Sequence, residues 1–533
     1  MTKTIKYIIG IVTVIIILLL VTPFFISLDS YKKIIALQVK EHSGRELKID
    51  GPISLDILPV PQIKLAQLNL SSLPQAKTSN FLEAEMVSAK LALFPLLKGK
   101  IVISSLELKK PVINLEKLKN GKGTWEFQSA EVADRSASVS VTQTTSSQSK
   151  NSPAKLPFII NDISIQGGRL KYIDKDKNIY IEDMDLDINI TDIYSSIHSA
   201  STILGSSQAA GSHWSHKRID LSGLSSANAT ISLKAKKLTD GAFLFENITM
   251  KSELEDGVLK IRSLTGGLYG GKLEGSGSIS AKTSQPMALK LTLKNAKVQN
   301  VVPEGRKIKV IGGIVDFACD IQSHGFSQFD YVKNMHGSIN LSGKDGRVSG
   351  IDLHKLIHAL DKPSDISAFT QGLEEAIGKG ETAFTSLKSD VSIEIGVMNI
   401  TKSELISNET SVVSEGKMNL SQFTLDVFAT VNSGVKHLPP VIIHFYGPLD
   451  NPQHKLDVKA IWQHLVNHAL TGVIDNLKQG KIKPKDLLKG IFNEKNEPSD
   501  KADTAHSNTE DNGESPQDGA NKLLEKGIKG LFK

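Results

Sequence analysis

The sequence contains little of what disulfide-rich, zinc-binding or nucleic-acid-binding proteins depend on. Among its 533 residues there is one cysteine, Cys319, and aromatic residues make up only 5%. A single cysteine excludes a disulfide framework and any zinc site built from cysteines. The net charge is +6, from 63 basic and 57 acidic residues, which lacks the clustered basicity of nucleic-acid-binding proteins. Apolar residues still make up 40%, so we expect a stable core built mainly from aliphatic side chains.

The sequence has only one apolar run long enough to cross a membrane. Residues 7–26 carry no charge, and a helix of that length reaches about 30 Å, the thickness of the hydrocarbon core of a bilayer. No A-x-A-like cleavage site follows, and the run exceeds the usual length of a cleaved secretion signal, which is the alternative. We therefore expect an uncleaved signal anchor, with residues 27–533 outside the cytoplasm. Its apolar positions include Tyr7, Ile15, Leu19 and Phe25.

Apolar and polar residues alternate through most of the remaining chain. This period of two is typical of β-strands with one apolar and one polar face. The clearest runs contain Met184, Leu186, Ile188 and Ile190; Leu289, Leu291 and Leu293; and Phe423, Leu425 and Val427. Turn sequences such as Asp256-Gly257 and Gly270-Gly271 separate such runs and predict hairpins.

The expected fold is mainly β: an N-terminal transmembrane helix followed by an elongated, curled antiparallel sheet with a few peripheral helices. About 25 strands spaced by about 4.8 Å would make a sheet of about 120 Å. Helical spacing occurs only in residues 29–41, 351–360 and 461–477. These helices are too few to cover such a sheet, so the sheet either closes on itself as a sandwich or curls into a groove that lipid tails occupy.

Changes in composition divide the chain into seven segments. We expect these to be a cytoplasmic tail with the anchor (1–26), an N-terminal β region (27–128), a Ser/Thr-rich linker (129–156), a β-groove body (157–450) with a disordered loop at about 195–229, a helical segment (451–492), an acidic disordered tether (493–520) and an amphipathic C-terminal helix (521–533). On that last helix Leu523, Leu524, Ile528, Leu531 and Phe532 gather on one side and lysines take much of the rest, a pattern that suits a membrane surface or a partner protein.

Three patterns in the sequence resemble catalytic or ligand sites, and none of them is complete. Gly266, Gly271 and Lys272 match a phosphate-binding loop, but Leu273 replaces the Ser or Thr that binds magnesium and the flanks predict strands, so these glycines are expected in hairpin turns. The pairs His354/His358 and His464/His468 have a metal-binding spacing without the glutamate of H-E-x-x-H, and are expected on ordinary amphipathic helices. We expect no catalytic residue, no metal and no cofactor.

The neighbouring carboxylates of Cys319 are expected to raise the pKa of its thiol, which argues against a cysteine nucleophile.

Several segments, in order, resemble the AsmA family of bacterial envelope proteins. The resemblance is carried by residues 43–53 (SGRELKIDGPI), 94–103 (FPLLKGKIVI), 106–115 (LELKKPVINL), 268–273 (LYGGKL) and 335–353. It implies a protein of the bacterial inner membrane with a periplasmic body, related to chorein-like bridge proteins whose curled sheet holds acyl chains. It also implies roles in phospholipid delivery and outer-membrane integrity, and it brings no catalytic residues.

The leading hypothesis is therefore a non-enzymatic protein that binds or conducts phospholipids between envelope membranes. Its partners would be the membrane, phospholipid acyl chains and envelope proteins, and not nucleic acid. The candidate groove residues are Met184, Leu186, Ile188, Ile190, Leu289, Leu291, Leu293, Phe423, Leu425 and Val427. The alternative is a scaffold that modulates outer-membrane protein assembly through strand addition at an exposed sheet edge. A periplasmic enzyme using the histidine pairs is a third, weaker hypothesis.

Overall fold

A computed structural model describes residues 30–56, 60–92, 102–126, 160–175, 177–193, 213–298, 309–361, 375–408, 410–435, 438–457 and 463. The predicted anchor, the 129–156 linker, most of the 451–492 segment, the tether and the C-terminal helix lie outside these residues. Within the described ranges, no helix combines the length and the apolarity that a membrane span requires.

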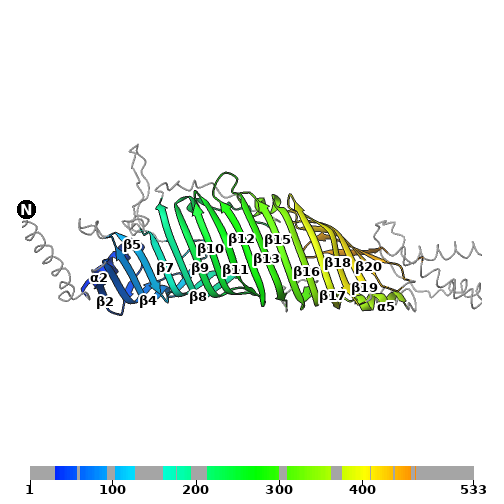
Figure 1. The fold of residues 1–533 in the computed structure, drawn as a ribbon, viewed down its shortest axis with the longest axis horizontal. Helices are drawn as coiled ribbons and strands as arrows, with labels where there is room; N and C mark the ends of the chain where they lie inside the picture. Colours follow the sequence, from blue (N-terminus) through cyan, green and yellow to red (C-terminus); the bar gives the residue numbers. More distant parts are fainter. Residues whose placement is uncertain are drawn as a thin grey trace, which may run out of the picture.

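The described residues form one 22-stranded sheet, elongated along the direction in which the strands succeed one another (Figure 1). Its first strands are β1 (Leu47–Ile49), β2 (Ile53–Asp56), β3 (Gln62–Ser71), β4 (Asn80–Leu91), β5 (Ile103–Lys109), β6 (Val112–Lys117), β7 (Asp162–Asp174), β8 (Lys177–Ile193), β9 (Ala227–Asp240), β10 (Phe243–Glu255) and β11 (Val258–Leu268). They are followed by β12 (Gly271–Ser280), β13 (Met287–Lys297), β14 (Lys309–Ile311), β15 (Ile314–Ser323), β16 (His336–Ile351), β17 (Ile377–Glu394), β18 (Val397–Ser407), β19 (Thr410–Asn419), β20 (Thr424–Asn432), β21 (Val441–Pro448) and β22 (Gln453–Asp457).

Few helices accompany these strands in the described part of the chain. They are α2 (Ser30–Ser43), α4 (Gln328–Lys333) and α5 (Leu353–Asp361), with a short 3-10 helix, η3 (Ser222–Ser225). The helices expected at residues 29–41 and 351–360 are confirmed as α2 and α5. The mainly β prediction is confirmed as well.

Nearly all strand pairs are antiparallel neighbours in the chain. Among the described strands, the parallel pairs are those of β7 with β5 and β6. In three places two strands lie end to end and pair with different parts of the same neighbouring strand. These are β1 and β2 beside β3, β5 and β6 beside β4, and β14 and β15 beside β16. The described sheet is therefore about 85 Å long at about 4.8 Å per step, shorter than predicted, because collinear short strands add no length.

A line of bulges crosses the sheet and bends its strands. One residue in the interior of each of β3, β7, β8, β10, β13 and β16, and one at the β5–β6 junction, takes a left-handed backbone conformation. We call these residues the crease, and they are Gln67, Lys110, Gly167, Asp183, Asn247, Asn295 and Asp345. The strand register shifts beside several of them. An extra, unpaired residue kinks a strand and increases its twist, so the crease folds the sheet along its length into two walls.

The crease also changes which side chains face inward. In β8, Ile179 and Ile181 alternate at odd positions before Asp183, and Met184 and Leu186 alternate at even positions after it. The extra residue at the crease moves the apolar side chains of the strand to its opposite face. The bend at the same point then turns that face toward the interior again. Apolar side chains from both walls consequently face the same interior, which we call the inner face.

One of the two edges along which the strands turn, which we call rim A, carries an additional segment of the chain. Rim A carries the β10–β11 turn at Asp256–Gly257, the β15–β16 connection and the β19–β20 turn. Residues 213–226, the rim segment, run along it: the Trp214 indole Nε1 donates to the Leu420 carbonyl at 2.6 Å, and Ile219 N donates to the Phe326 carbonyl at 2.7 Å. The loop predicted at about 195–229 is therefore too long at its C-terminal end, because these contacts order residues 213–226 and β9 begins at Ala227.

Candidate functional site

A continuous row of side chains crosses the inner face from β2 to β21. Each member pairs directly with the next across neighbouring strands. In order they are Ile53, Leu65, Val87, Leu108, Ile165, Leu186, Leu233, Met250, Leu264, Gly275, Leu291, Cys319, Ile339, Val391, Ile400, Gly416, Val427 and Phe445. No charged side chain interrupts this row.

Gly275 does not interrupt the apolar surface of the row. A Cβ built on Gly275 would lie 2.4 Å from Leu291 Cδ2. The side chain of Leu291 therefore already covers this position, and a larger residue at 275 would displace it.

Side chains beside the crease are more deeply buried than those on the rest of the inner face. Beside the crease, Met184 is 2% exposed, Ala235 3% and Ala296 0%. Farther along the same strands Leu186, Leu233, Met250, Leu264 and Leu291 are only half-buried. A second layer of structure would bury such side chains completely. The middle of the inner face is therefore an apolar groove, with its floor at the crease.

The two hydrophobic cores of the described residues lie at opposite ends of this groove. Near the N-terminal end Leu108, Ile165 and Met184 form one core, against which Leu170 and Ile181 of the other wall also pack. Near the C-terminal end α5 packs on β20 and β21. The strands between them leave their apolar face partly accessible.

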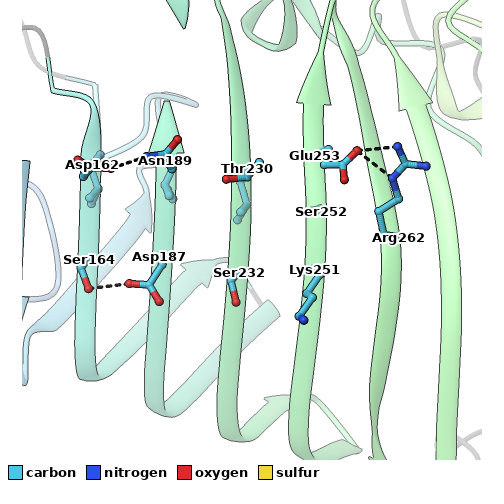
Figure 2. Close-up of a pocket in the computed structure, with 13 residues that line it drawn as sticks. Asp162, Ser164, Asp187, Asn189, Thr230, Ser232, Lys251, Ser252, Glu253 and Arg262 are labelled. Carbon is cyan, nitrogen blue, oxygen red and sulfur yellow. Dashed lines mark hydrogen bonds and ion pairs between the residues drawn. The ribbon is translucent and has the colours of Figure 1, made fainter. Parts of the chain in front are cut away.

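The outer face of the same strands is polar. Figure 2 shows a shallow depression over β7 to β11, with strands that bend at its lower side and continue behind it. Its side chains pair with one another: Asn189 Nδ2 donates to Asp162 at 2.6 Å and Ser164 Oγ donates to Asp187 at 2.7 Å (Figure 2). Arg262 donates two hydrogen bonds to Glu253 Oε2, which lower the pKa of that carboxyl group. These contacts are those of a solvated strand surface.

Comparison with known proteins agrees with this architecture. A profile of the AsmA family matches residues 1–209 and 200–403, most of the chain. The chain belongs to the AsmA family. The two AsmA matches meet within the β8–β9 connection, and the second ends in β18, so the inner face continues three strands beyond the matched region. No curated protein and no solved structure matched the chain.

Most of the predicted groove residues of this AsmA-family protein lie on the inner face. Leu186, Leu291 and Val427 belong to the continuous row, and Met184 lies beside the crease. The rows on either side of it contain Ile188, Ile190, Leu289, Leu293 and Leu425.

The structure places Phe423 elsewhere. It precedes β20 in a left-handed conformation on rim A, and its ring stacks on His213 with centroids 4.0 Å apart. The alternation of the sequence extends one residue too far at this turn.

Cys319 lies in the middle of the row, buried between Leu291 and Ile339. Burial is the main cause that raises the pKa of its thiol, and the charge of Asp320 adds to the increase. A raised pKa keeps the thiol protonated, so Cys319 acts as part of the apolar lining.

The other motifs take structural positions. Gly266 lies in β11, and Gly271 and Lys272 lie in β12, joined by a turn with left-handed Tyr269 and Gly270. His354 and His358 are exposed on α5, whereas His464 and His468 lie outside the described residues. Among the residues that the structure describes, no three metal-binding side chains converge.

Proposed function

We propose that this AsmA-family protein binds phospholipid acyl chains on its inner face and passes them between the membranes of a bacterial envelope. In this proposal residues 7–26 anchor the chain in the inner membrane, residues 27–533 lie in the periplasm, and no chemical step occurs. Outer-membrane biogenesis would depend on the lipid that it delivers. The uninterrupted apolar row from Ile53 to Phe445 is the observation that carries this proposal.

Aliphatic side chains favour acyl chains over other ligands. Each methylene removed from water contributes about 0.8 kcal/mol to the free energy of binding. The half-buried leucines retain exposed apolar surface that an acyl chain can cover. The row contains no charged residue that would select a head group. We therefore expect binding that depends on chain length more than on the identity of the head group.

The length of the groove suits lipid. From β8 to β17 the groove extends over about 40 Å at about 4.8 Å per strand. One leaflet of a bilayer core is about 15 Å thick, half of about 30 Å. Acyl chains lying across the strands would therefore fit end to end.

Native mass spectrometry of the detergent-solubilised full chain tests the proposal. Bound phospholipid is expected with the native protein and should be strongly reduced by Leu291→Asp, which places a charge in the row. Lys290→Asp, on the outer face of the same strand, is the matched control and should retain lipid. Lipid-free native protein, or equal loss in both variants, would contradict the proposal.

The exposed edge strand favours a second candidate, a scaffold for outer-membrane protein assembly. Among the described strands β22 pairs only with β21, and most of its residues are exposed. Such an edge can accept a strand from another protein. This candidate predicts crosslinks from β22 to protein partners and no effect of Leu291→Asp on activity.

A further inference from the structure

The inner face is covered at its C-terminal end, in contrast to its middle. There α5 lies against the strands, with Leu353 2% exposed and Leu356 0% exposed. Beneath it Val431, Val441 and Ile443 are each 0% exposed. Leu405 and Val412 pack against the same core. These side chains continue the inner face whose equivalents on β8 to β13 are only half-buried.

The second wall of the sheet ends where α5 begins. Residues 377–384 of β17 pair with the end of β16, whereas β18 pairs only with the later part of β17, from Ser386 to Glu394. From β18 onward α5 therefore takes the place of the opposite wall (Figure 1). It packs on β20 and β21, where Val431, Val441 and Ile443 are fully buried.

Polar contacts hold the N-terminal end of α5. The Thr382 hydroxyl accepts a hydrogen bond from Leu353 N at 3.0 Å and donates to the Ile351 carbonyl at 2.7 Å. Asp352 Oδ1 accepts from Lys355 N at 3.0 Å and caps the first turn. Thr382 is 4% exposed, so this attachment is part of the folded core.

We infer that α5 is a stop that ends the lipid-binding groove, occupying on β18 to β21 the place that acyl chains take on β8 to β17. This inference rests on the proposed function. Lipid can reach the C-terminal strands only when α5 leaves its position. Acyl chains and the leucines of α5 offer the strands the same kind of apolar contact, so lipid that displaces α5 replaces the contacts it removes.

Site-specific photo-crosslinking in the full chain tests this inference. A photoreactive phenylalanine replaces either Leu291, in the open part, or Leu405, beside α5; both are half-buried leucines of the inner face. The protein is loaded with dioleoyl phosphatidylethanolamine, and crosslinked lipid is measured by mass spectrometry. We expect crosslinks at position 291 and about tenfold fewer at 405, which corresponds to about 1.4 kcal/mol against moving the helix.

Leu356→Asp should expel α5 and raise crosslinking at 405 to the level at 291. His354→Asp puts the same charge on the exposed side of the helix and should leave the pattern unchanged. Thr382→Val removes the attachment without adding a charge to the core and should give an intermediate increase at 405, which keeps the test valid if Leu356→Asp does not fold.

Each result has one interpretation. Absence of crosslinks at both positions contradicts the proposed function itself. Equal crosslinking at 291 and 405 in the native protein shows that α5 is no barrier. Crosslinks confined to 291 in both Leu356→Asp and Thr382→Val show that something other than α5 ends the groove.

Discussion

The backbone amide of Asn295 donates a hydrogen bond to Oδ1 of Asp316 at 2.6 Å, across the point where β13 bends. The same relationship recurs in β7, where Gly167 N donates to Asp185 Oδ1 at 2.9 Å. A bulged residue has no partner in the strand ladder. At these two points of the crease, a carboxylate from the neighbouring strand provides the missing acceptor.

Removal of that acceptor should destabilise the crease. Asp316→Ala removes the acceptor of the Asn295 amide in an exposed hydrogen bond, and we expect the free energy of unfolding to fall by about 0.5–1.5 kcal/mol. Thermal unfolding of the detergent-solubilised protein measures the loss. Asp320→Ala is the control on the same strand: it removes an exposed ion pair with Lys290, which contributes about 0–1 kcal/mol. Equal losses would show that the hydrogen bond at the bend has no special role.

The left-handed backbone conformation of Asp183 at the crease predicts how substitutions at this position change stability. Its φ is 52°, a region that valine strongly disfavours. Asp183→Val should lower the free energy of unfolding by about 1–2 kcal/mol relative to Asp183→Gly. Lys234→Val, at an exposed position in β9 with an ordinary strand conformation, should change stability by no more than about 0.5 kcal/mol. The same thermal measurement distinguishes them, and a tolerated valine at 183 would argue against a fixed bend.

The only cysteine of the chain reports on the groove directly. Burial raises the pKa of the Cys319 thiol, so at pH 8.5 it should react with a small maleimide more slowly than an exposed cysteine. Added phospholipid should slow the reaction further, because Leu291 and Ile339 flank the thiol on the face proposed to hold lipid. A labelling rate that lipid leaves unchanged would count against lipid at this position.

The raised pKa of the Cys319 thiol also makes the free energy of unfolding depend on pH, with a known sign. Because the folded state holds the thiol proton more tightly than the unfolded state, the contribution of Cys319 is complete below the unfolded pKa of about 8.5 and is lost as pH rises through the folded value. Cys319→Ala should therefore reduce the loss of unfolding free energy between pH 8 and 10. An identical pH profile in the variant would mean that other groups are responsible.

The attachment of the rim segment depends on Trp214. Trp214→Phe removes the hydrogen bond to the Leu420 carbonyl and keeps an aromatic ring near Phe423. We expect residues 213–226 to become more sensitive to limited proteolysis. Trp125→Phe, at a site 39% exposed beside Tyr172, provides the matched control and should leave the cleavage pattern of this segment unchanged. Unaltered protection of the segment in Trp214→Phe would contradict its attachment through the indole.

Alternation predicted the β fold and nine of the ten groove residues on the inner face, because the period of two is a direct consequence of strand geometry. The crease was missed although the sequence carries its signal. In β8, β10 and β16 the alternation changes parity at a single Asp or Asn, namely Asp183, Asn247 and Asp345. Such a break resembles the end of one strand and the start of the next, and only the paired neighbours reveal one bent strand.

The rim segment and the role of α5 were not predictable for a different reason. Residues 213–226 are rich in Ser, and their partners lie far along the chain, such as Gln328 at the start of α4 and Leu420 in the turn after β19. The apolar spacing of residues 351–360 predicts a helix but does not indicate which strands it covers. Contacts over such separations leave no local pattern in one sequence.

The hydrogen bond from Trp214 to Leu420 joins residues 206 apart in the chain. Strands that pair only with their neighbours can form and fray one at a time, as the units of a repeat protein do. A segment that leaves the sheet before β9 and is attached beside β19 makes the early strands sensitive to the formation of the late ones. The rim segment should therefore give a serial array of hairpins a single cooperative unfolding transition.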